Sequence, residues 1–278
     1  MEHIVAIQKK IHYLWLSDKK DERVERCIQS WRECLEGYEI VEWNKDNFPF
    51  NDFLYAREAY SKQKWAFVTD YFRLWVLEKY GGIYLDADVT VYGNFDRFLD
   101  NQLFVGTEFT DQVAAHVIGA KPHHPFIQKC LEYYKDRHFI LPDGSCDMNA
   151  MPCIITKVFM EMYRYKGELV KFDGRPLNFS DMTIYPDSYF TINTFDGNNV
   201  CVHNGLGSWR DAGSENPVLE NVVGAYFWKR FCRKEIFSYG TLKKWIYLLM
   251  PVWLLVLYSK HSAKIKNNKR VKRINFSR

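Results

Sequence analysis

The sequence predicts an α/β fold, with a mixed, mainly parallel sheet flanked by helices. Three observations support this prediction. Strand-like and helix-like segments alternate from the start of the chain, a Gly-Gly pair at 81–82 separates a long apolar helix from a further strand, and 47% of the 278 residues are hydrophobic. A chain with this much apolar material can bury a large core between two layers of helices.

The predicted elements begin in a strand, helix, strand order. Residues 9–17, KKIHYLWLS, form a short apolar run that predicts a buried strand, and residues 38–44, YEIVEWN, predict a second one. Apolar residues at helical spacing between Val24 and Leu35 predict a helix that ends at Gly37. The remaining expectations are a helix at 60–80, strands at 83–92, 102–106 and 113–120, helices at 124–136 and 153–165, and short strands around Ile184 and Val202.

Charge divides the chain into two parts. Residues 241–278 contain ten Lys/Arg and no Asp/Glu, whereas residues 1–240 carry 28 Lys/Arg against 34 Asp/Glu. We therefore expect a globular domain at 1–240 and a basic tail at 241–278 whose partner is an anionic surface. Nucleic acid is not an expected partner, because the acidic domain would repel phosphate.

The tail contains an uncharged apolar segment of fourteen residues at 245–258. As a helix it would span about 21 Å, which is short of the roughly 30 Å hydrocarbon core of a bilayer. Pro251 interrupts it, and lysines flank it on both sides. The pattern predicts an anchor that lies in the membrane interface. A core helix followed by a disordered basic end is the alternative.

Cysteine usage bears on the compartment. The seven cysteines form neither a C-x-x-C pair nor a disulfide framework, and the apolar run near the N-terminus, at 11–16, has only six residues. The spacing fits a reducing cytosol, and no secretory signal is expected. We expect a cytoplasmic protein that is peripherally associated with the inner face of the plasma membrane.

Asp86 and Asp88 lie one residue apart in the expected strand at 83–92. Strand alternation would put both carboxylates on one face, with their Cβ atoms about 7 Å apart. Two anions beside a core repel each other unless water or a cation lies between them, and hard oxygen ligands suit Mg²⁺ or Mn²⁺. A solvated strand end is the alternative. The motif, however, ends a strand after a helix and a Gly-Gly stop, where open α/β sheets bind ligands.

The block at 64–89, KWAFVTDYFRLWVLEKYGGIYLDADV, resembles the signature of glycosyltransferase family 32. That signature is an A-x-x-(S/T)-D-x-x-R helix followed by G-G-x-Y-x-D-x-D, and the chain matches each position. The opening strand, HPFIQ at 124–128 and HNGLGSW at 203–209 resemble further elements, so the resemblance spans about residues 8–210. It implies a Rossmann-like fold of the GT-A type. The family it resembles includes bacterial capsule enzymes and yeast mannosyltransferases, and clostridial glucosylating toxins share its architecture.

The resemblance implies roles for the charged residues. Asp70 and Arg73 would hold hydroxyl groups of the donor sugar, and Arg73 would also support the two aspartates; a plain salt bridge within the helix is the alternative. Asp88, with Asp86 beside it, would hold Mn²⁺ or Mg²⁺ against the diphosphate. His203 would complete the metal shell or bind a phosphate.

Other residues are implied to contact the nucleotide. In the Gly-rich loop at 203–209, Ser208 and Trp209 would donate hydrogen bonds to the leaving diphosphate. Many relatives have histidine where this chain has Asn204, so the third metal ligand is left open between His203 and Asn204. On the opening strand, Tyr13 and Trp15 would contact the base, with Trp15 stacked on uracil; core packing is the alternative for Trp15.

The implied activity is a metal-dependent transfer of a hexose that retains the anomeric configuration. The donor would be a nucleoside-diphosphate sugar, with a UDP-sugar favoured and GDP-mannose as the alternative. The acceptor would be a lipid-linked oligosaccharide or glycan in the synthesis of a bacterial capsule, O-antigen or exopolysaccharide.

Two readings from other classes compete with this one. DADVT also fits the D-x-D-x-(T/V) motif of haloacid-dehalogenase-like phosphatases, but about 80 residues precede it here and no G-D-x-x-x-D element follows. The other reading is a non-catalytic, metal-dependent sugar-binding module on a membrane tether.

Overall fold

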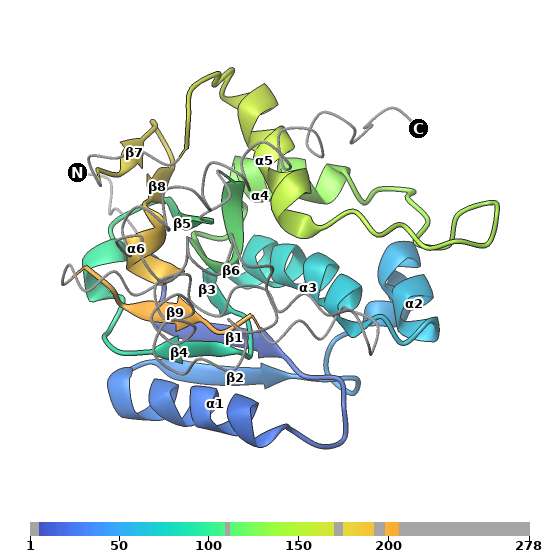
Figure 1. The fold of residues 1–278 in the computed structure, drawn as a ribbon, viewed down its shortest axis with the longest axis horizontal. Coiled ribbons are helices and arrows are strands. Elements are labelled where there is room, and N and C mark those ends of the chain that lie inside the picture. Colours follow the sequence, from blue (N-terminus) through green and yellow to red (C-terminus); the bar gives the residue numbers. More distant parts are fainter. Residues whose placement is uncertain (1–5, 109–111, 170–174, 192–197, 206–278) are drawn as a thin grey trace, which may run out of the picture.

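The computed structural model describes residues 6–108, 112–169, 175–191 and 198–205. Its centre is a seven-stranded sheet with the strand order β2-β1-β3-β6-β5-β8-β7 (Figure 1). The strands are β1 (Lys10–Leu14), β2 (Glu39–Trp43), β3 (Gly82–Leu85), β5 (Leu103–Glu108), β6 (Gln112–Ala120), β7 (Leu177–Asn178) and β8 (Thr183–Tyr185).

The sheet is mixed and mainly parallel, as predicted. β1 pairs in parallel with both β2 and β3, and β5 pairs in parallel with β8. β6 runs antiparallel to β3 and β5, and β7 runs antiparallel to β8. Five of the seven strands therefore point the same way, and their carboxyl ends meet at one edge of the sheet.

The first strand, helix, strand unit forms because each segment supplies the pattern its element needs. Helix α1 (Glu22–Cys34) begins at Asp21, whose carboxylate accepts a hydrogen bond of 2.8 Å from the backbone N–H of Arg23. The helix buries one face, which includes Trp31. The chain then turns at Gly37, with φ +78°, and returns as β2 beside β1.

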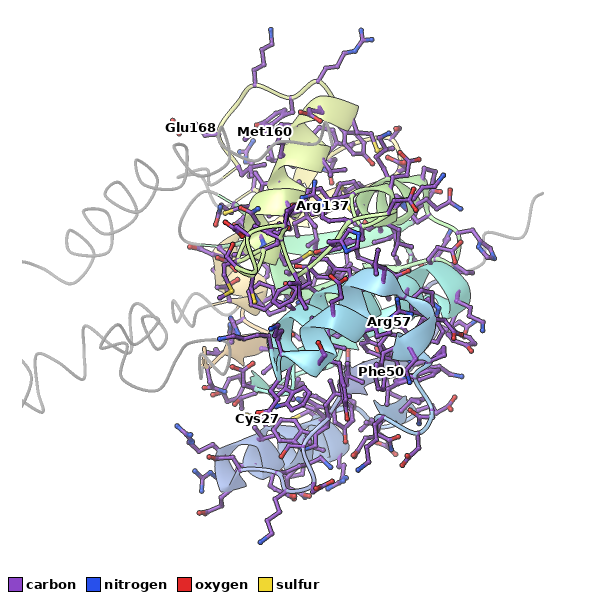
Figure 2. All side chains as sticks on the ribbon, turned by 90° about the vertical axis from the view of Figure 1, so that its right-hand side faces the viewer. Cys27, Phe50, Arg57, Arg137, Met160 and Glu168 are labelled. Carbon is purple, nitrogen blue, oxygen red and sulfur yellow. The ribbon has the colours of Figure 1, made fainter. Side chains whose placement is uncertain are left out.

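The two faces of the sheet carry separate apolar cores. Helices α2 (Leu54–Ser61), α3 (Trp65–Tyr80), α4 (Pro125–Glu132) and α5 (Met151–Met162) cover one face. Helix α1, the short helix α6 (Asp187–Phe190) and the 3₁₀ turn η2 (Asp96–Phe98) cover the other. Figure 2 shows this layering from the side, with Cys27 of α1 and Met160 of α5 at opposite ends of the molecule. The sheet is thus buried on both faces, as is usual for parallel strands.

The helix expected at 60–80 is wrong at its start. The structure has two helices here, because the chain reverses between Ser61 and Trp65, and a 3₁₀ turn, η1 (Phe50–Asp52), precedes them. Gln63 takes a left-handed conformation with φ +56°, which an α-helix does not allow. The long apolar helix is therefore α3 alone.

The Gly-Gly pair at 81–82 ends α3 and also lets β3 approach its neighbours. Both glycines have positive φ values, +64° and +89°. A Cβ on Gly82 would lie 2.7 Å from the carbonyl oxygen of Lys10 in β1, and one on Gly81 would lie 2.7 Å from Cδ of Pro122. A larger residue at 82 would therefore push β3 away from β1, and one at 81 would clash with the segment that follows β6.

The single strand expected at 83–92 is also wrong. β3 ends at Leu85, and the chain turns through residues 86–88 before β4 (Val89–Val91) starts. β4 leaves the main sheet and forms a separate two-stranded sheet with β9 (Cys201–His203). The reason is a turn in which the N–H of Val89 donates to the carbonyl oxygen of Asp86 at 3.0 Å.

Several predicted features lie outside the described residues: Ser208, Trp209, the boundary at 240 and the tail at 241–278. Among the residues that are described, none of the helices has both the length and the apolar character needed to cross a bilayer.

Candidate functional site

The site lies where three parallel strands end. Trp15 follows β1, Asn44 follows β2 and Asp86 follows β3, each by one residue. These strands pair in parallel, with His12 opposite Tyr84 in the register of β1 and β3. The three residues therefore lie along one edge of the sheet, where open α/β sheets place their ligands.

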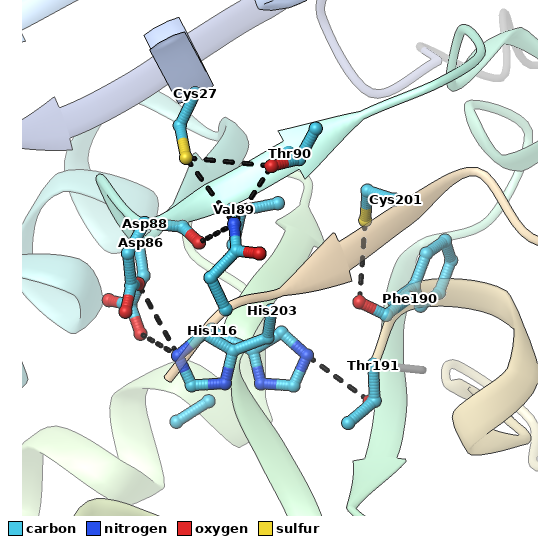
Figure 3. Close-up of polar contacts among 12 residues, drawn as sticks. Cys27, Asp86, Asp88, Val89, Thr90, His116, Phe190, Thr191, Cys201 and His203 are labelled. Atoms are coloured by element: carbon cyan, nitrogen blue, oxygen red, sulfur yellow. Dashed lines mark hydrogen bonds and ion pairs between the residues drawn. The ribbon is translucent and has the colours of Figure 1, made fainter. Parts of the chain in front are cut away.

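The D-x-D turn and β9 bring three potential ligands together. The N–H of Asp86 donates to the carbonyl oxygen of His116 in β6 at 2.9 Å, and this bond fixes the start of the turn. His203 stands opposite Val89 in the β4–β9 pair, which places it next to Asp88. Figure 3 shows the imidazole of His203 facing both aspartates.

The geometry of Asp86, Asp88 and His203 fits a small divalent cation. Each residue offers one ligand atom, and these atoms lie within 4.8 Å of one another. Nε2 of His203 is 3.3 Å from Asp88 Oδ1 and 3.9 Å from Asp86 Oδ2. Adjacent ligands of an octahedral Mg²⁺ or Mn²⁺ ion lie about 3 Å apart, given metal–oxygen distances of about 2.1 Å. Two carboxylates and one imidazole suit such an ion and leave coordination positions for a substrate.

Electrostatics make His203 the counter-charge of the aspartates in the metal-free protein. Burial opposes the charged form of the ring, but Asp88, which also accepts its hydrogen bond, and Asp86 outweigh burial and raise the pKa of His203 to about 9. The side chain of His203 is 22% exposed. A cation that binds here would therefore replace a proton on His203.

Asp86 divides its two oxygens between the protein and the site. Oδ1 accepts a hydrogen bond from the hydroxyl of Tyr84 and lies 3.3 Å from Nη1 of Arg73. The guanidinium of Arg73 also lies 4.7 Å from the centre of the Tyr84 ring, over its face. The other oxygen, Oδ2, faces His203. The neighbours of Oδ1 therefore fix the orientation in which Oδ2 meets a ligand.

Asp70 and Arg73 form a buried ion pair beside the D-x-D turn. Nη2 of Arg73 donates to Asp70 Oδ1 at 2.7 Å, and Nη1 donates to the carbonyl oxygen of Ala115 at 2.6 Å. Burial is the main cause that raises the pKa of Asp70, to about 7, and Asp86 adds to it while Arg73 opposes it. The pair is more than a link within α3, because Arg73 also joins Asp86.

Asn204 faces the protein through its amide nitrogen. Both its backbone N–H and its Nδ2 donate to the carbonyl oxygen of Asp88, at 3.0 and 2.8 Å, and Nδ2 also contacts Oγ1 of Thr90 at 2.8 Å. These bonds tie the end of β9 to the D-x-D turn. Of the two candidates for the third ligand, His203 is the one that the structure brings to the aspartates; its role and that of Asn204 stay predictions.

Trp15 and Tyr13 lie in different surroundings, although both were expected to contact the nucleotide. Trp15 lines a pocket formed by the segments after β1 and β2, together with Glu42, Asn44 and Lys45. Its indole N–H is buried and has no hydrogen-bond partner among the described residues. The contact of Trp15 with a nucleotide stays a prediction.

Tyr13 instead packs under α1, and its contact with a nucleotide stays a prediction. The ring is 2% exposed and meets the ring of Trp31 edge-on, with centroids 5.2 Å apart. Its hydroxyl donates to the carboxylate of Glu42, a residue of the pocket. Tyr13 and Trp15 share one face of the chain, because they are two residues apart. Tyr13 lies inside β1 under α1, whereas Trp15 lies one residue beyond the end of β1, at the sheet edge.

Two residues that contact the site were not predicted from the sequence, Tyr84 and His116. Tyr84 is one of the positions of the matched signature, but its hydrogen bond to Asp86 could not be predicted from the motif. His116 was only part of an expected strand, yet its ring stacks on His203 with centroids 4.3 Å apart. A histidine in the middle of an otherwise small and apolar strand was the available signal for it.

Comparison with known proteins supports the family suggested by the sequence. Residues 21–105 match the model of a glycosyltransferase sugar-binding region containing a DXD motif. A mannosyl phosphorylinositol ceramide synthase (CSH1) of Saccharomyces cerevisiae is 23% identical over 245 residues, which are 84% of this chain and 63% of that protein. An inositol phosphoceramide mannosyltransferase of Schizosaccharomyces pombe is 30% identical over 44% of this chain and 35% of its own length. A human alpha-1,4-N-acetylglucosaminyltransferase is 27% identical over 47% of this chain and 37% of its own length.

Solved glycosyltransferase structures show a more distant similarity. PaToxG glycosyltransferase is 16% identical with a TM-score of 0.42, over 57% of this chain and 70% of that one. GlyE of Streptococcus pneumoniae is 11% identical with a TM-score of 0.38, over 92% of this chain and 64% of that one. The chain spans less than two thirds of the length of the three curated relatives described above. The matched region includes the D-x-D turn, so residues 21–105 carry the glycosyltransferase sugar-binding region containing a DXD motif that the resemblance to glycosyltransferase family 32 implied.

Proposed function

We propose that the chain is a metal-dependent, retaining glycosyltransferase that moves a hexose from a nucleoside-diphosphate sugar to a lipid-linked or glycan acceptor. The observation that carries this proposal is the convergence of Asp86, Asp88 and His203 within 4.8 Å at the carboxyl edge of the parallel strands. Metal ligands at this edge, with open coordination positions, suit a diphosphate more than they suit a purely structural ion.

A bound divalent cation would neutralise the negative charge that the diphosphate gathers as the glycosidic bond lengthens. The residues of the chain do the rest. Asp86 and Asp88 would hold the cation, and Arg73 lies 3.3 Å from the other oxygen of Asp86 and would keep that side chain in place. Asp70, 7% exposed, is bonded to Arg73, which also joins Asp86. Its carboxyl group would accept a hydrogen bond from a hydroxyl of the sugar, or donate one to it.

The nucleoside would occupy the pocket beside Trp15. The unpartnered indole N–H offers a hydrogen-bond donor, and Glu42 and Asn44 offer groups for the ribose or the base. Glu42 is held in place by the hydroxyl of Tyr13 and by Nζ of Lys20, at 2.7 Å. The pocket and the aspartates lie along the same sheet edge, as a nucleoside and its diphosphate require.

A UDP-sugar is the donor that we propose, and GDP-mannose is the second candidate. The second candidate is favoured by the names of the two yeast relatives, a mannosyl phosphorylinositol ceramide synthase and a mannosyltransferase. The human relative, named for N-acetylglucosamine, favours neither a mannosyl donor nor a single sugar for the whole family. The hexoses differ by single hydroxyl or acetamido groups, so a few side chains in the pocket decide between them.

A donor panel tests the activity. The full chain would be incubated with UDP-glucose, UDP-galactose, UDP-N-acetylglucosamine and GDP-mannose, with and without Mn²⁺, and the free nucleoside diphosphate measured. We expect one donor to be hydrolysed in a Mn²⁺-dependent way. Release of inorganic phosphate from simple phosphate esters would instead indicate a phosphatase, and no release from any donor would indicate a binding module.

The acceptor and the location rest on the sequence of the tail. We propose a lipid-linked acceptor of a surface polysaccharide, met at the inner face of the plasma membrane, since the basic residues at 241–278 would bind anionic lipid. Truncation after Gly240 tests this location. We expect the shortened protein to leave the membrane fraction of a cell lysate, and a protein that stays there as before would contradict the anchor.

A further inference from the structure

We propose that His116 is a positioning residue that sets the orientation of the His203 imidazole and thereby the affinity of the site for its divalent cation. The inference rests on the proposed metal site. It goes beyond that site because His116 belongs neither to the D-x-D motif nor to the three potential ligands.

His116 touches both segments that carry the ligands. Its backbone carbonyl oxygen accepts the N–H of Asp86 at 2.9 Å, which holds the beginning of the D-x-D turn. Its ring lies almost parallel to the ring of His203, at 14°, with centroids 4.3 Å apart (Figure 3). Residues 86 and 203 are far apart in sequence, and a single residue in β6 contacts both.

The ring of His116 is itself held firmly. It is 1% exposed, and Nε2 lies 3.2 Å from Oγ1 of Thr191. That hydroxyl donates to the carbonyl oxygen of Thr107 at 2.8 Å, so it accepts from Nε2–H of His116. Thr191 also accepts the backbone N–H of His203 through its carbonyl oxygen, at 3.2 Å. The two histidines are therefore joined both by their rings and through Thr191.

Burial distinguishes the two roles. His203 is 22% exposed and points Nε2 at the carboxylates, whereas His116 is covered and stacks on the ring of His203. A rotation of the His203 ring about its side-chain bonds would break this stack. The stack therefore restricts the ring to the orientation that meets Asp86 and Asp88, before any cation binds.

The substitution His116→Ala removes the ring and keeps the backbone bond to Asp86, so it separates the two contacts. In the metal-free full chain, ¹H–¹³C spectra of the imidazoles report the ring environment directly. We expect the His203 resonances, assigned with His203→Gln, to shift and broaden in His116→Ala. They should stay in place in His124→Ala, which removes another buried histidine ring, bonded to the carbonyl oxygen of Asp181 at 2.9 Å. Unchanged His203 resonances in His116→Ala would overturn the proposal.

Binding of Mn²⁺, measured by calorimetry, is the second readout. Loss of a supporting residue behind a metal ligand typically weakens binding about tenfold or more, and we expect this for His116→Ala. His116→Phe keeps a flat ring and should recover most of the affinity. If it is as weak as the alanine variant, or if the alanine variant binds as wild type does, stacking does not position His203.

The two readouts also separate this inference from the proposed function. If the wild-type chain binds no Mn²⁺, the metal site fails, and the metal-free spectra still decide whether His116 orders His203. If the wild type binds Mn²⁺ and His116→Ala has the same spectra and the same Mn²⁺ affinity, only the positioning role fails.

Discussion

His12 and His203 show how one residue type serves two opposite purposes in the same domain. His12 lies within β1 and His203 ends β9. Burial and Lys10 lower the pKa of His12 to about 4, whereas the aspartates raise the pKa of His203 to about 9. Nδ1 of His12 accepts from the indole N–H of Trp43 at 3.1 Å, and Nε2 faces the carbonyl oxygen of Gly81 at 3.2 Å. One donor and one acceptor fit the neutral ring completely.

The difference lies in the partners of the two rings. Nε2 of His203 faces the carboxylates of Asp86 and Asp88, so its surroundings favour a positive charge, either a proton or a metal ion. His12 is a satisfied part of the core. A histidine whose ring nitrogen faces carboxylates therefore indicates a place for a proton or a metal ion.

The largest effect is expected from Asp88→Ala, which removes one of the acceptors around His203. Without it the site keeps one carboxylate and one imidazole, so Mn²⁺ binding should fall below detection. The rate of transfer should drop about a thousandfold, the scale on which a lost electrostatic contact to a leaving group acts. Calorimetry with Mn²⁺ and the donor assay measure the two effects.

The matched control for Asp88→Ala is Asp52→Ala, a change at an exposed aspartate in η1. It should bind Mn²⁺ and transfer sugar as the wild type does. Wild-type Mn²⁺ affinity in Asp88→Ala would remove the basis of the comparison between the two histidines.

The next effect concerns the boundary between core and site, where Arg73 joins Asp70 to Asp86. Removal of one partner from a buried ion pair costs roughly 3–5 kcal/mol of stability. We expect Arg73→Met to lower the unfolding free energy by about 3 kcal/mol, the lower end of this range. The reason is that Asp70, whose pKa is raised mainly by burial to about 7, can take up a proton. Denaturant unfolding measures this loss.

Arg137→Met is the control for Arg73→Met. Arg137 pairs with the buried Asp147 at 3.4 Å, away from the D-x-D turn. Both variants should lose stability, but only Arg73→Met should lose transfer activity at temperatures where both remain folded. Equal activity in the two folded variants would assign Arg73 a purely structural role.

Much of the fold could be predicted because each element carries a local pattern. The helix at 24–35, the Gly-Gly stop and the parallel β1–β2 pair are fixed by spacing and by glycines, and the structure has them. The break at Gln63 could not be predicted, since a left-handed residue other than glycine or asparagine leaves no signal in one sequence. The departure of β4 from the main sheet depends on β9, more than a hundred residues later.

In the site, too, residues with a local pattern could be predicted, and contacts between distant segments could not. Asp86 and Asp88 were expected to face the same way on a strand, and they do converge, but through a turn. Pattern and resemblance together indicated His203 and the Asp70–Arg73 pair. His116 and the inward turn of Tyr13 depend on packing between distant segments, which periodicity alone does not encode.

A smaller effect on the unfolding free energy is expected when the pH is lowered. It tests whether His12 is neutral in the folded protein. In the unfolded chain a histidine has a pKa near 6.5, so His12 is stabilising above that value and its contribution is lost as the pH falls from about 6.5 to 4. Between pH 7 and 5 this single residue should cost about 2 kcal/mol of unfolding free energy. Lys10 opposes and Glu39 favours its protonation.

His12→Gln tests this, because glutamine can accept from Trp43 and donate to Gly81 without titrating. Its unfolding free energy should fall about 2 kcal/mol less than that of the wild type between pH 7 and 5. His123→Gln, the same change at an exposed histidine bonded to Glu78, is the control. If His12→Gln keeps the wild-type slope, His12 does not titrate as its two partners require.

The smallest effect is expected from Asn204→Ala, which loosens the turn without removing a metal ligand. The variant loses the Nδ2 bonds to the carbonyl oxygen of Asp88 and to Thr90 but keeps the backbone bond to Asp88. We expect a loss of about 1–2 kcal/mol of stability and a Mn²⁺ affinity weakened by somewhat less than tenfold, the lower end for supporting residues. Asn101→Ala, which loses amide bonds to Phe98 and Tyr185 instead, should lose similar stability and keep its Mn²⁺ affinity. If both variants bind Mn²⁺ equally well, the bonds from Asn204 to Asp88 do not order the metal ligands. The positions of Asp86, Asp88 and His203 would then depend on Arg73 and on the stacked rings of His116 and His203.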